Sequence, residues 1–136
     1  MSNFFRILFF IIIAAIFYLS FHNFTYQNRP FFYFLVNFND KLNHIVAFVT
    51  LAFLLEKAYN IKNRLLHIFI LLSIGGFIEF YQLFFVPGRS FSLKDFLADV
   101  IGILIYFTIK KLYSLKNKKV KIYKIENLKY RTFSWN

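Results

Sequence analysis

The stretch LLHIFILLSIGGFIEFYQLFFV, residues 65–86, decides the fold, because its 22 residues carry a single charge, that of Glu79. At a helical rise of about 1.5 Å per residue, this length crosses a hydrocarbon core about 30 Å thick. A soluble domain of 136 residues needs a polar surface, but 59% of this chain is hydrophobic, 22 residues are Phe and only 17% are charged. The sequence therefore predicts an integral membrane protein.

Three further apolar runs accompany this stretch. The run 4–21 contains Arg6 as its lone charge and lacks the small-residue cleavage pattern of a signal peptide, so we interpret it as an uncleaved helix rather than a leader. The runs 42–55 and 96–109 have 14 residues each, a length that suits a buried core helix or part of a span. Because so little polar surface is available, we extend both through their polar ends and predict that both span the membrane.

The predicted fold is therefore an all-α integral membrane bundle, because backbone groups in lipid must be hydrogen-bonded within their own segment. The four transmembrane helices are expected at about residues 4–21, 40–58, 64–86 and 93–112. Residues 1–112 would form the four-helix transmembrane domain, and residues 113–136 a basic juxtamembrane tail.

The charge distribution predicts the orientation. The chain has 17 Lys and Arg against 6 Asp and Glu, a formal charge of +11. Nine of these basic residues lie from Lys110 onward with one acid, Glu126, so residues 110–136 alone carry +8. The positive-inside rule places the tail and the basic loop 57–64 in the cytoplasm, with both termini inside and the loops 22–39 and 87–94 outside. We expect a multi-pass protein of the bacterial cytoplasmic (inner) membrane.

Nine polar residues fall at the outer ends of the last three predicted helices and form the candidate pocket. They are Asp40, Lys41, His44, Glu79, Gln82, Arg89, Ser92, Asp95 and Asp99. Spacings of three or four residues place His44 on one face with Asp40 and Lys41, and Asp95 on one face with Asp99. Because an unpartnered ionisable group inside a span costs about 2.5 kcal/mol or more, we predict one shared outward-facing pocket with Glu79 at its centre.

Structural roles explain some of these residues equally well. Asp40 suits a helix N-cap, and the spacing of Ser92 and Asp95 suits a capping box. Arg89 after a Pro-Gly pair suits a solvated turn, and the pair Gly75–Gly76 suits close helix packing.

The ordered set of motifs resembles the VanZ-like family of small bacterial membrane proteins, named for a member that confers teicoplanin resistance. The motifs are Asp40-Lys41-x-x-His44, Gly76-x-x-Glu79-x-x-Gln82 and Pro87-Gly88-Arg89-Ser90-x-Ser92-x-x-Asp95-x-x-Ala98-Asp99-x-x-Gly102. The resemblance covers roughly residues 40–109, and the first helix fits it by position only. The family often has Asn where this chain has Asp99, which adds a second carboxylate. The resemblance implies a four-helix protein of the cell envelope and supplies no mechanism.

We interpret the pocket as a binding site for an anionic lipid headgroup or a lipid-linked cell-wall precursor, in which Lys41, His44 and Arg89 contact phosphate or carboxylate. The resemblance implies a link to glycopeptide resistance. The alternative is an intramembrane enzyme that modifies such a lipid by His–carboxylate acid–base chemistry or with a divalent ion. No nucleophile motif or metal-binding spacing supports it, so we assign no catalytic residues, no metal and no cofactor.

Two other classes fit the sequence less well. A channel or transporter is disfavoured, because four short helices leave little room for alternating access. Aromatic residues interleave with the lysines of the tail, as in some nucleic-acid-binding segments. We nevertheless expect the tail to bind anionic lipid and not nucleic acid, because a juxtamembrane polybasic segment gains about 1 kcal/mol per basic residue near such a surface.

Overall fold

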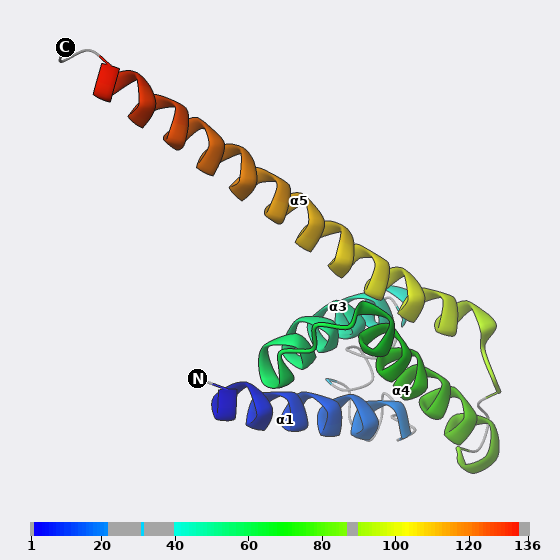
Figure 1. The fold of residues 1–136 in the computed structure, drawn as a ribbon. Coiled ribbons are helices and arrows are strands. Elements are labelled where there is room, and N and C mark those ends of the chain that lie inside the picture. The colour runs from blue at the N-terminus through cyan, green and yellow to red at the C-terminus, as the bar shows by residue number, and fades with distance from the viewer. Residues whose placement is uncertain (1, 22–30, 32–39, 87–89, 134–136) are drawn as a thin grey trace. The chain divides into compact units, whose positions relative to one another are not determined.

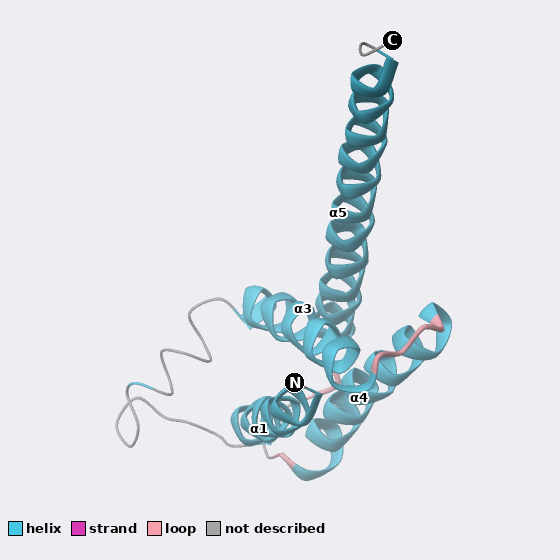
Figure 2. Cartoon of the chain, turned by 60° about the vertical axis from the view of Figure 1, so that its left-hand side comes forward, coloured by secondary structure: helices cyan, strands magenta, loops and turns pink. Residues whose placement is uncertain are grey.

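The computed structural model describes residues 2–21, 31, 40–86 and 90–133, with side chains described as far as residue 124. These residues form helices and short connections, with no strand among them (Figures 1 and 2). The helices are α1, Ser2–Phe21, α3, Asp40–Tyr59, α4, Arg64–Phe85, and α5, Leu93–Phe133. The all-α prediction is confirmed. The aromatic segment 32–39 and the loop residues 87–89, which include Arg89, lie outside the described residues.

Three helices are long and apolar enough to cross a membrane: α1 from Asn3, α3 and α4. Their bounds agree with the predicted spans to within about two residues. The fourth span remains a prediction, because the first 18 residues of α5 contain Lys94, Asp95, Asp99 and Lys110. Large apolar side chains face outward from the bundle, such as Phe69, 68% exposed, and Phe80, 58% exposed. A bilayer explains this exposure, because water would penalise it.

The helix ends follow from local sequence. Asn60 adopts a positive φ of 50°, and its N–H donates to the carbonyl of Glu56 at 2.8 Å, which closes α3. Asn63 then caps α4, since its Oδ1 accepts from the N–H groups of Leu65 and Leu66 at 2.9 and 3.2 Å. The short basic connection between α3 and α4 is thereby fixed by two asparagines.

The chain divides into two compact units, residues 1–105 and 106–136. In the first unit α3 is the central helix, because Phe48, Leu51 and Leu55 are almost fully buried. α1 runs antiparallel to it, as Arg6 near the start of α1 donates from Nε to the carbonyl of Ala58 near the end of α3, at 3.2 Å. The C-terminal end of α1 meets that of α4, where Phe21 stacks on Tyr81 with ring centroids 4.0 Å apart.

The second unit is a continuous helical part of α5. The predicted span ended near Leu112, but the helix continues to Phe133. No Gly or Pro interrupts the chain after Gly102, and the Lys-rich segment is built largely of residues that tolerate a helix well. The basic tail, from Lys110, is therefore helical as far as Phe133.

Candidate functional site

The ionisable residues of three helices meet at one end of the first unit. α3 and the first part of α5 start at this end and run in the same direction, while α4 ends there. As a result, side chains more than 50 positions apart become neighbours: Lys41 contacts Asp95, and His44 contacts Asp99. The residue spacing had predicted which polar residues share a face of each helix. The packing of the helices decides which of these residues contact one another.

The His44–Asp99 pair is the most enclosed of these contacts. His44 Nδ1 lies 2.7 Å from Asp99 Oδ1, with side-chain exposures of 14% and 1%. Asp99 Oδ2 faces α4 at a glycine, because a Cβ placed on Gly75 would lie 2.7 Å from it. Gly75 thus makes room for the carboxylate, a more specific role than general helix packing.

A second glycine brings the helices together below this pair. A Cβ on Gly102 would lie 2.6 Å from the carbonyl oxygen of Ile45 and 3.0 Å from Cβ of Phe48. The backbones of α3 and α5 are therefore in close contact beside His44 and Asp99. This approach is what allows short Asp and His side chains to reach each other.

The start of α5 is capped by residues from two helices. The N–H of Asp95 donates to Oγ of Ser92 at 3.2 Å, which confirms Ser92 as the N-cap. In a capping box the acid three residues on would accept from the N–H of the cap residue. Here Glu79 of α4 takes that place, since its Oε2 accepts from the N–H of Ser92 at 2.9 Å.

Because Glu79 accepts from the N–H of Ser92, the carboxylate of Asp95 is available for another partner. Lys41 Nζ lies 3.1 Å from Asp95 Oδ1, with side-chain exposures of 53% and 14%. The pair lies at the rim of the site, where Lys41 remains accessible to a ligand.

Two carboxylate oxygens in the site have no hydrogen-bond partner within the described part of the chain, Oε1 of Glu79 and Oδ2 of Asp99. Glu79 is 0% exposed and Asp99 is 1% exposed. Buried carboxylate oxygens normally have partners, because an unmade hydrogen bond costs about 1–3 kcal/mol and more for a charged group. The site is thus rich in acceptors and short of donors.

Three side chains of the site have metal-ligand chemistry. One ligand atom each from Asp40, His44 and Asp95 lie within 4.8 Å of one another, and all three residues are partly exposed. Asp95 is therefore not limited to helix capping, because its carboxylate also pairs with Lys41.

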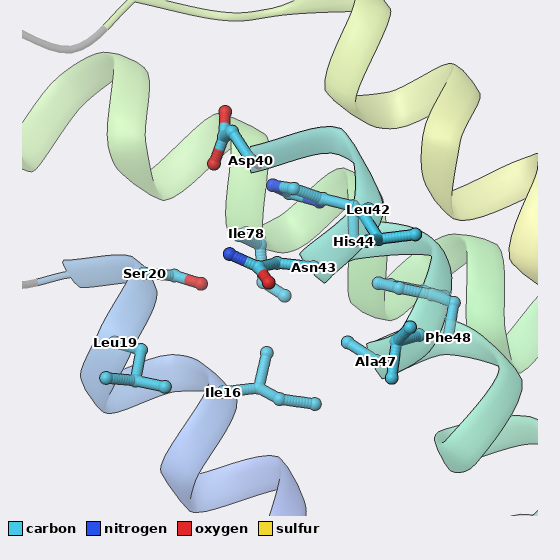
Figure 3. Close-up of a pocket in the computed structure, with 11 residues that line it drawn as sticks. Ile16, Leu19, Ser20, Asp40, Leu42, Asn43, His44, Ala47, Phe48 and Ile78 are labelled. Atoms are coloured by element: carbon cyan, nitrogen blue, oxygen red, sulfur yellow. The ribbon is translucent and has the colours of Figure 1, made fainter. Parts of the chain in front are cut away.

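A cavity of about 320 Å³ adjoins the site between α1, α3 and α4 (Figure 3). Its walls are mainly apolar, with Ile16 and Leu19 from α1 and Phe48 and Ile78 from the other two helices. Its polar lining residues are Ser20, Asp40, Asn43 and His44. Figure 3 shows Asp40, Asn43 and His44 together at one end of the cavity. The cavity is therefore apolar along its walls and polar at one end.

The sequence model of the VanZ/LLP1 family matches residues 3–114 of the chain. This protein belongs to the VanZ/LLP1 family. The match includes α1, so the first helix is part of the family's sequence pattern, whereas the motifs had indicated only about residues 40–109. Neither a curated protein nor a solved structure matches this chain.

In this VanZ/LLP1 protein the predicted pocket residues separate into two groups. One group makes contacts between helices: Lys41, Asp95, Ser92 and Glu79 form one series of contacts, His44 and Asp99 form a separate pair, and Asp40 lies near His44 and Asp95. Gln82 turns elsewhere, since its Nε2 donates to the carbonyl of Ser20 at the end of α1 at 2.9 Å. Glu79 accepts a hydrogen bond from the backbone N–H of Ser92, a partner that the residue spacing had not predicted.

Sequence reasoning also missed residues that line the cavity. Asn43 carried a signal, as a polar residue next to His44 in an otherwise apolar helix. Ile16, Leu19 and Ser20 carried none, because nothing in the uniformly apolar α1 indicates which face meets α3.

Proposed function

We propose that this VanZ/LLP1 membrane protein binds a lipid with an anionic headgroup, either a phospholipid or a lipid-linked cell-wall precursor. The observation that carries the proposal is the cavity between α1, α3 and α4, which is apolar along its walls and polar at one end. A lipid has the same division. The cavity has a volume of about 320 Å³, at the lower end of the range for ligand pockets, which is about 300–1,000 Å³. This volume suits part of one acyl or isoprenoid chain.

The headgroup would lie at the polar end, beside Asn43, His44 and Lys41. Lys41 supplies a cation that is half exposed and held by a single ion pair, so an anionic oxygen can reach it. Asn43 supplies an amide that can donate to phosphate or sugar oxygens. Arg89, which precedes the start of α5 in the sequence, is expected to add a second cation.

The proposed orientation places this polar end outside the cell. The basic connection between α3 and α4 lies at the opposite end of α3 from Asp40, and the basic tail would lie on its side of the membrane. Cysteines introduced at Ser90 and Asn117 test this. We expect an impermeant thiol reagent to label Ser90→Cys in intact cells and Asn117→Cys only after lysis; the reverse pattern would overturn the orientation.

An enzyme that modifies such a lipid is the second candidate, because His44 is held by Asp99 at 2.7 Å. A carboxylate that fixes one imidazole nitrogen leaves the other free for general acid–base work. The binding proposal needs no nucleophile, and the described residues place no Ser or Thr side chain in hydrogen-bond contact with His44.

Native mass spectrometry of the full-length protein, extracted gently from its membrane, tests the binding proposal. We expect the wild type to retain a phosphate-containing lipid, and Lys41→Ala and Arg89→Ala to lose most of it. Lys57→Ala is the matched control, because Lys57 lies at the other end of α3, 5.8 Å from the ring of Phe53. Equal retention in all four proteins, or no lipid in the wild type, would contradict the proposal, and a chemically altered lipid would favour the enzyme.

Two finer parts of the proposal have their own readouts. A role in glycopeptide resistance predicts that expression lowers teicoplanin susceptibility and that Lys41→Ala abolishes this effect. The basic tail, from Lys110, is proposed to bind anionic lipid of the cytoplasmic leaflet, which predicts weaker binding of a synthetic tail peptide to vesicles at high salt.

A further inference from the structure

We propose that Asp40, His44 and Asp95 form a binding site for a divalent cation, with Zn²⁺ as the best-suited metal. One imidazole nitrogen and two carboxylate oxygens are ligands that Zn²⁺ accepts in proteins, and three protein ligands leave a position open for water or substrate. The cation site goes beyond lipid binding and stands without it.

The positions of the three side chains support the proposal. Their ligand atoms lie within 4.8 Å of one another, whereas ligands at about 2.1 Å in tetrahedral geometry would be about 3.4 Å apart. Small side-chain rotations of Asp40 and Asp95 would close this difference. Figure 3 shows the His44 ring turned toward the Asp40 carboxylate. All three residues are partly exposed, so an ion has a path of entry.

Asp99 supplies the outer interaction that a metal-binding histidine usually has. Its Oδ1 lies 2.7 Å from Nδ1 of His44. When Nδ1–H donates to this carboxylate, the lone pair of Nε2 is left for the metal, and the ring is held in place. Asp99 is therefore a positioning residue and not a ligand.

The charge of the site gives an independent argument. Four carboxylates meet here, and two of them, Asp95 and Asp99, are paired with Lys41 and His44. Asp40 and Glu79 have no ion-pair partner among the described residues. These two carboxyl groups are without a cationic partner in the described part of the chain, and an ionised group with no partner is costly at a membrane-embedded site. A divalent cation would supply a positive partner to such groups.

Glu79 adds a second observation. Its side chain is 0% exposed, and its Oε1 has no hydrogen-bond partner among the described residues, although Oε2 is held by the N–H of Ser92. Glu79 is linked through this cap to Asp95, one of the proposed ligands. A buried acceptor of this kind indicates that a proton donor, water or cation belongs beside it.

A bound cation would also change what the pocket attracts. Without it the described carboxylates oppose the attraction of Lys41 for an anionic headgroup, whereas with it a phosphate oxygen can also take the open coordination position. This consequence, unlike the cation site itself, rests on the proposed function.

The test uses the full-length protein in detergent, without an affinity tag, stripped with a chelator and then titrated with Zn²⁺ alone in phosphate-free buffer by calorimetry. We expect one ion per chain in the wild type. His44→Gln and Asp95→Asn should abolish this binding, and Asp99→Asn should weaken it by about 10–100-fold, as loss of an outer partner does. Glu56→Gln, a carboxylate-to-amide change at the other end of α3, should bind as the wild type does.

A second measurement guards against variants that fail to fold. Asp40→Asn alters a partly exposed ligand that makes no hydrogen bond with the described residues, so its fold should survive, and Zn²⁺ should raise the thermal midpoint of the wild type but not of this variant. Absence of saturable binding by the wild type, or binding by Asp40→Asn and His44→Gln as tight as that of the wild type, would overturn the proposal. Because no lipid enters the titration, its failure would leave the lipid-retention result unaffected, and the reverse is also true.

Discussion

The two helix interfaces that share α3 are built in opposite ways. Against α1, the central helix presents aromatic residues, as in the pairs Phe5–Phe53 and Phe9–Tyr59, whose ring centroids lie 6.3 and 6.1 Å apart. Against the first part of α5 it presents His44 and the backbone of Ile45, which meet Asp99 and Gly102 at contact distance. Apart from the hydrogen bond from Arg6 to the carbonyl of Ala58, the interface with α1 is made of large apolar groups, whereas the interface with α5 is made of small and charged ones.

The difference shows how strictly each interface fixes the register of its two helices. Aromatic packing tolerates sliding and substitution, because many rotamers fill a similar volume. The interface with α5 has little freedom, since a glycine contact and an enclosed ion pair each allow one register. We infer that the aromatic interface chiefly holds α1 in place, while the polar one fixes the geometry of the site.

The largest effect is expected from breaking the enclosed pair. His44→Leu leaves Asp99 buried without its partner, which should destabilise the protein by about 3 kcal/mol. The measurement is thermal unfolding in detergent, followed by circular dichroism. The double variant His44→Leu with Asp99→Leu should recover much of the loss, because two apolar groups leave no unpaired charge. If Asp99→Leu lowered the stability of the His44→Leu variant as much as it lowers that of the wild type, the two residues would not be coupled.

The next effect concerns the backbone approach of α3 and α5. Gly102→Ala should cost about 1–3 kcal/mol, because its Cβ would lie 2.6 Å from a backbone oxygen that has little room to move. Gly76→Ala is the matched control, since the nearest atom to its Cβ is a ring carbon of Phe96 at 4.0 Å. We expect the control to be neutral or stabilising, given the helix propensity of Ala. Equal thermal midpoints for the two variants would show that the close approach is not required.

A smaller effect is expected at the aromatic interface. Phe5→Leu removes the edge-to-face contact with Phe53 while keeping an apolar side chain, which should cost about 1 kcal/mol. Zn²⁺ binding and lipid retention should stay as in the wild type. A loss of either would mean that α1 packing controls the site after all, and the contrast between the two interfaces would weaken.

The smallest effect is expected from the tail. Deleting residues 117–136 should change the thermal midpoint of the helical bundle by little, because the described side chains from Lys116 to Lys124 are exposed. The readouts are insertion into membranes and thermal unfolding of the truncated protein. A large loss of inserted, folded protein would show that the tail contributes to the fold.

Much of the candidate site was predictable from the sequence. The positions of Asp40, Lys41 and His44 on one face follow from helical periodicity, and the cost of a charge in lipid indicated that Glu79 and Asp99 need partners. The cap at Ser92 was readable from a four-residue pattern and is confirmed. The partners themselves were not readable, because spacing within one helix carries no information about which neighbour its face meets.

The sequence by itself determined that this protein is helical and apolar enough for a membrane, where its first three described helices begin and end, and which family it belongs to. These properties depend on hydrophobicity, capping and order along the chain, all of which are local. Only the tertiary structure decided that Glu79 completes the cap of α5, that Gln82 turns to α1, and that Gly75 makes room for Asp99. Those contacts depend on the rotation and register of whole helices, which are set by the packing of every side chain along their length.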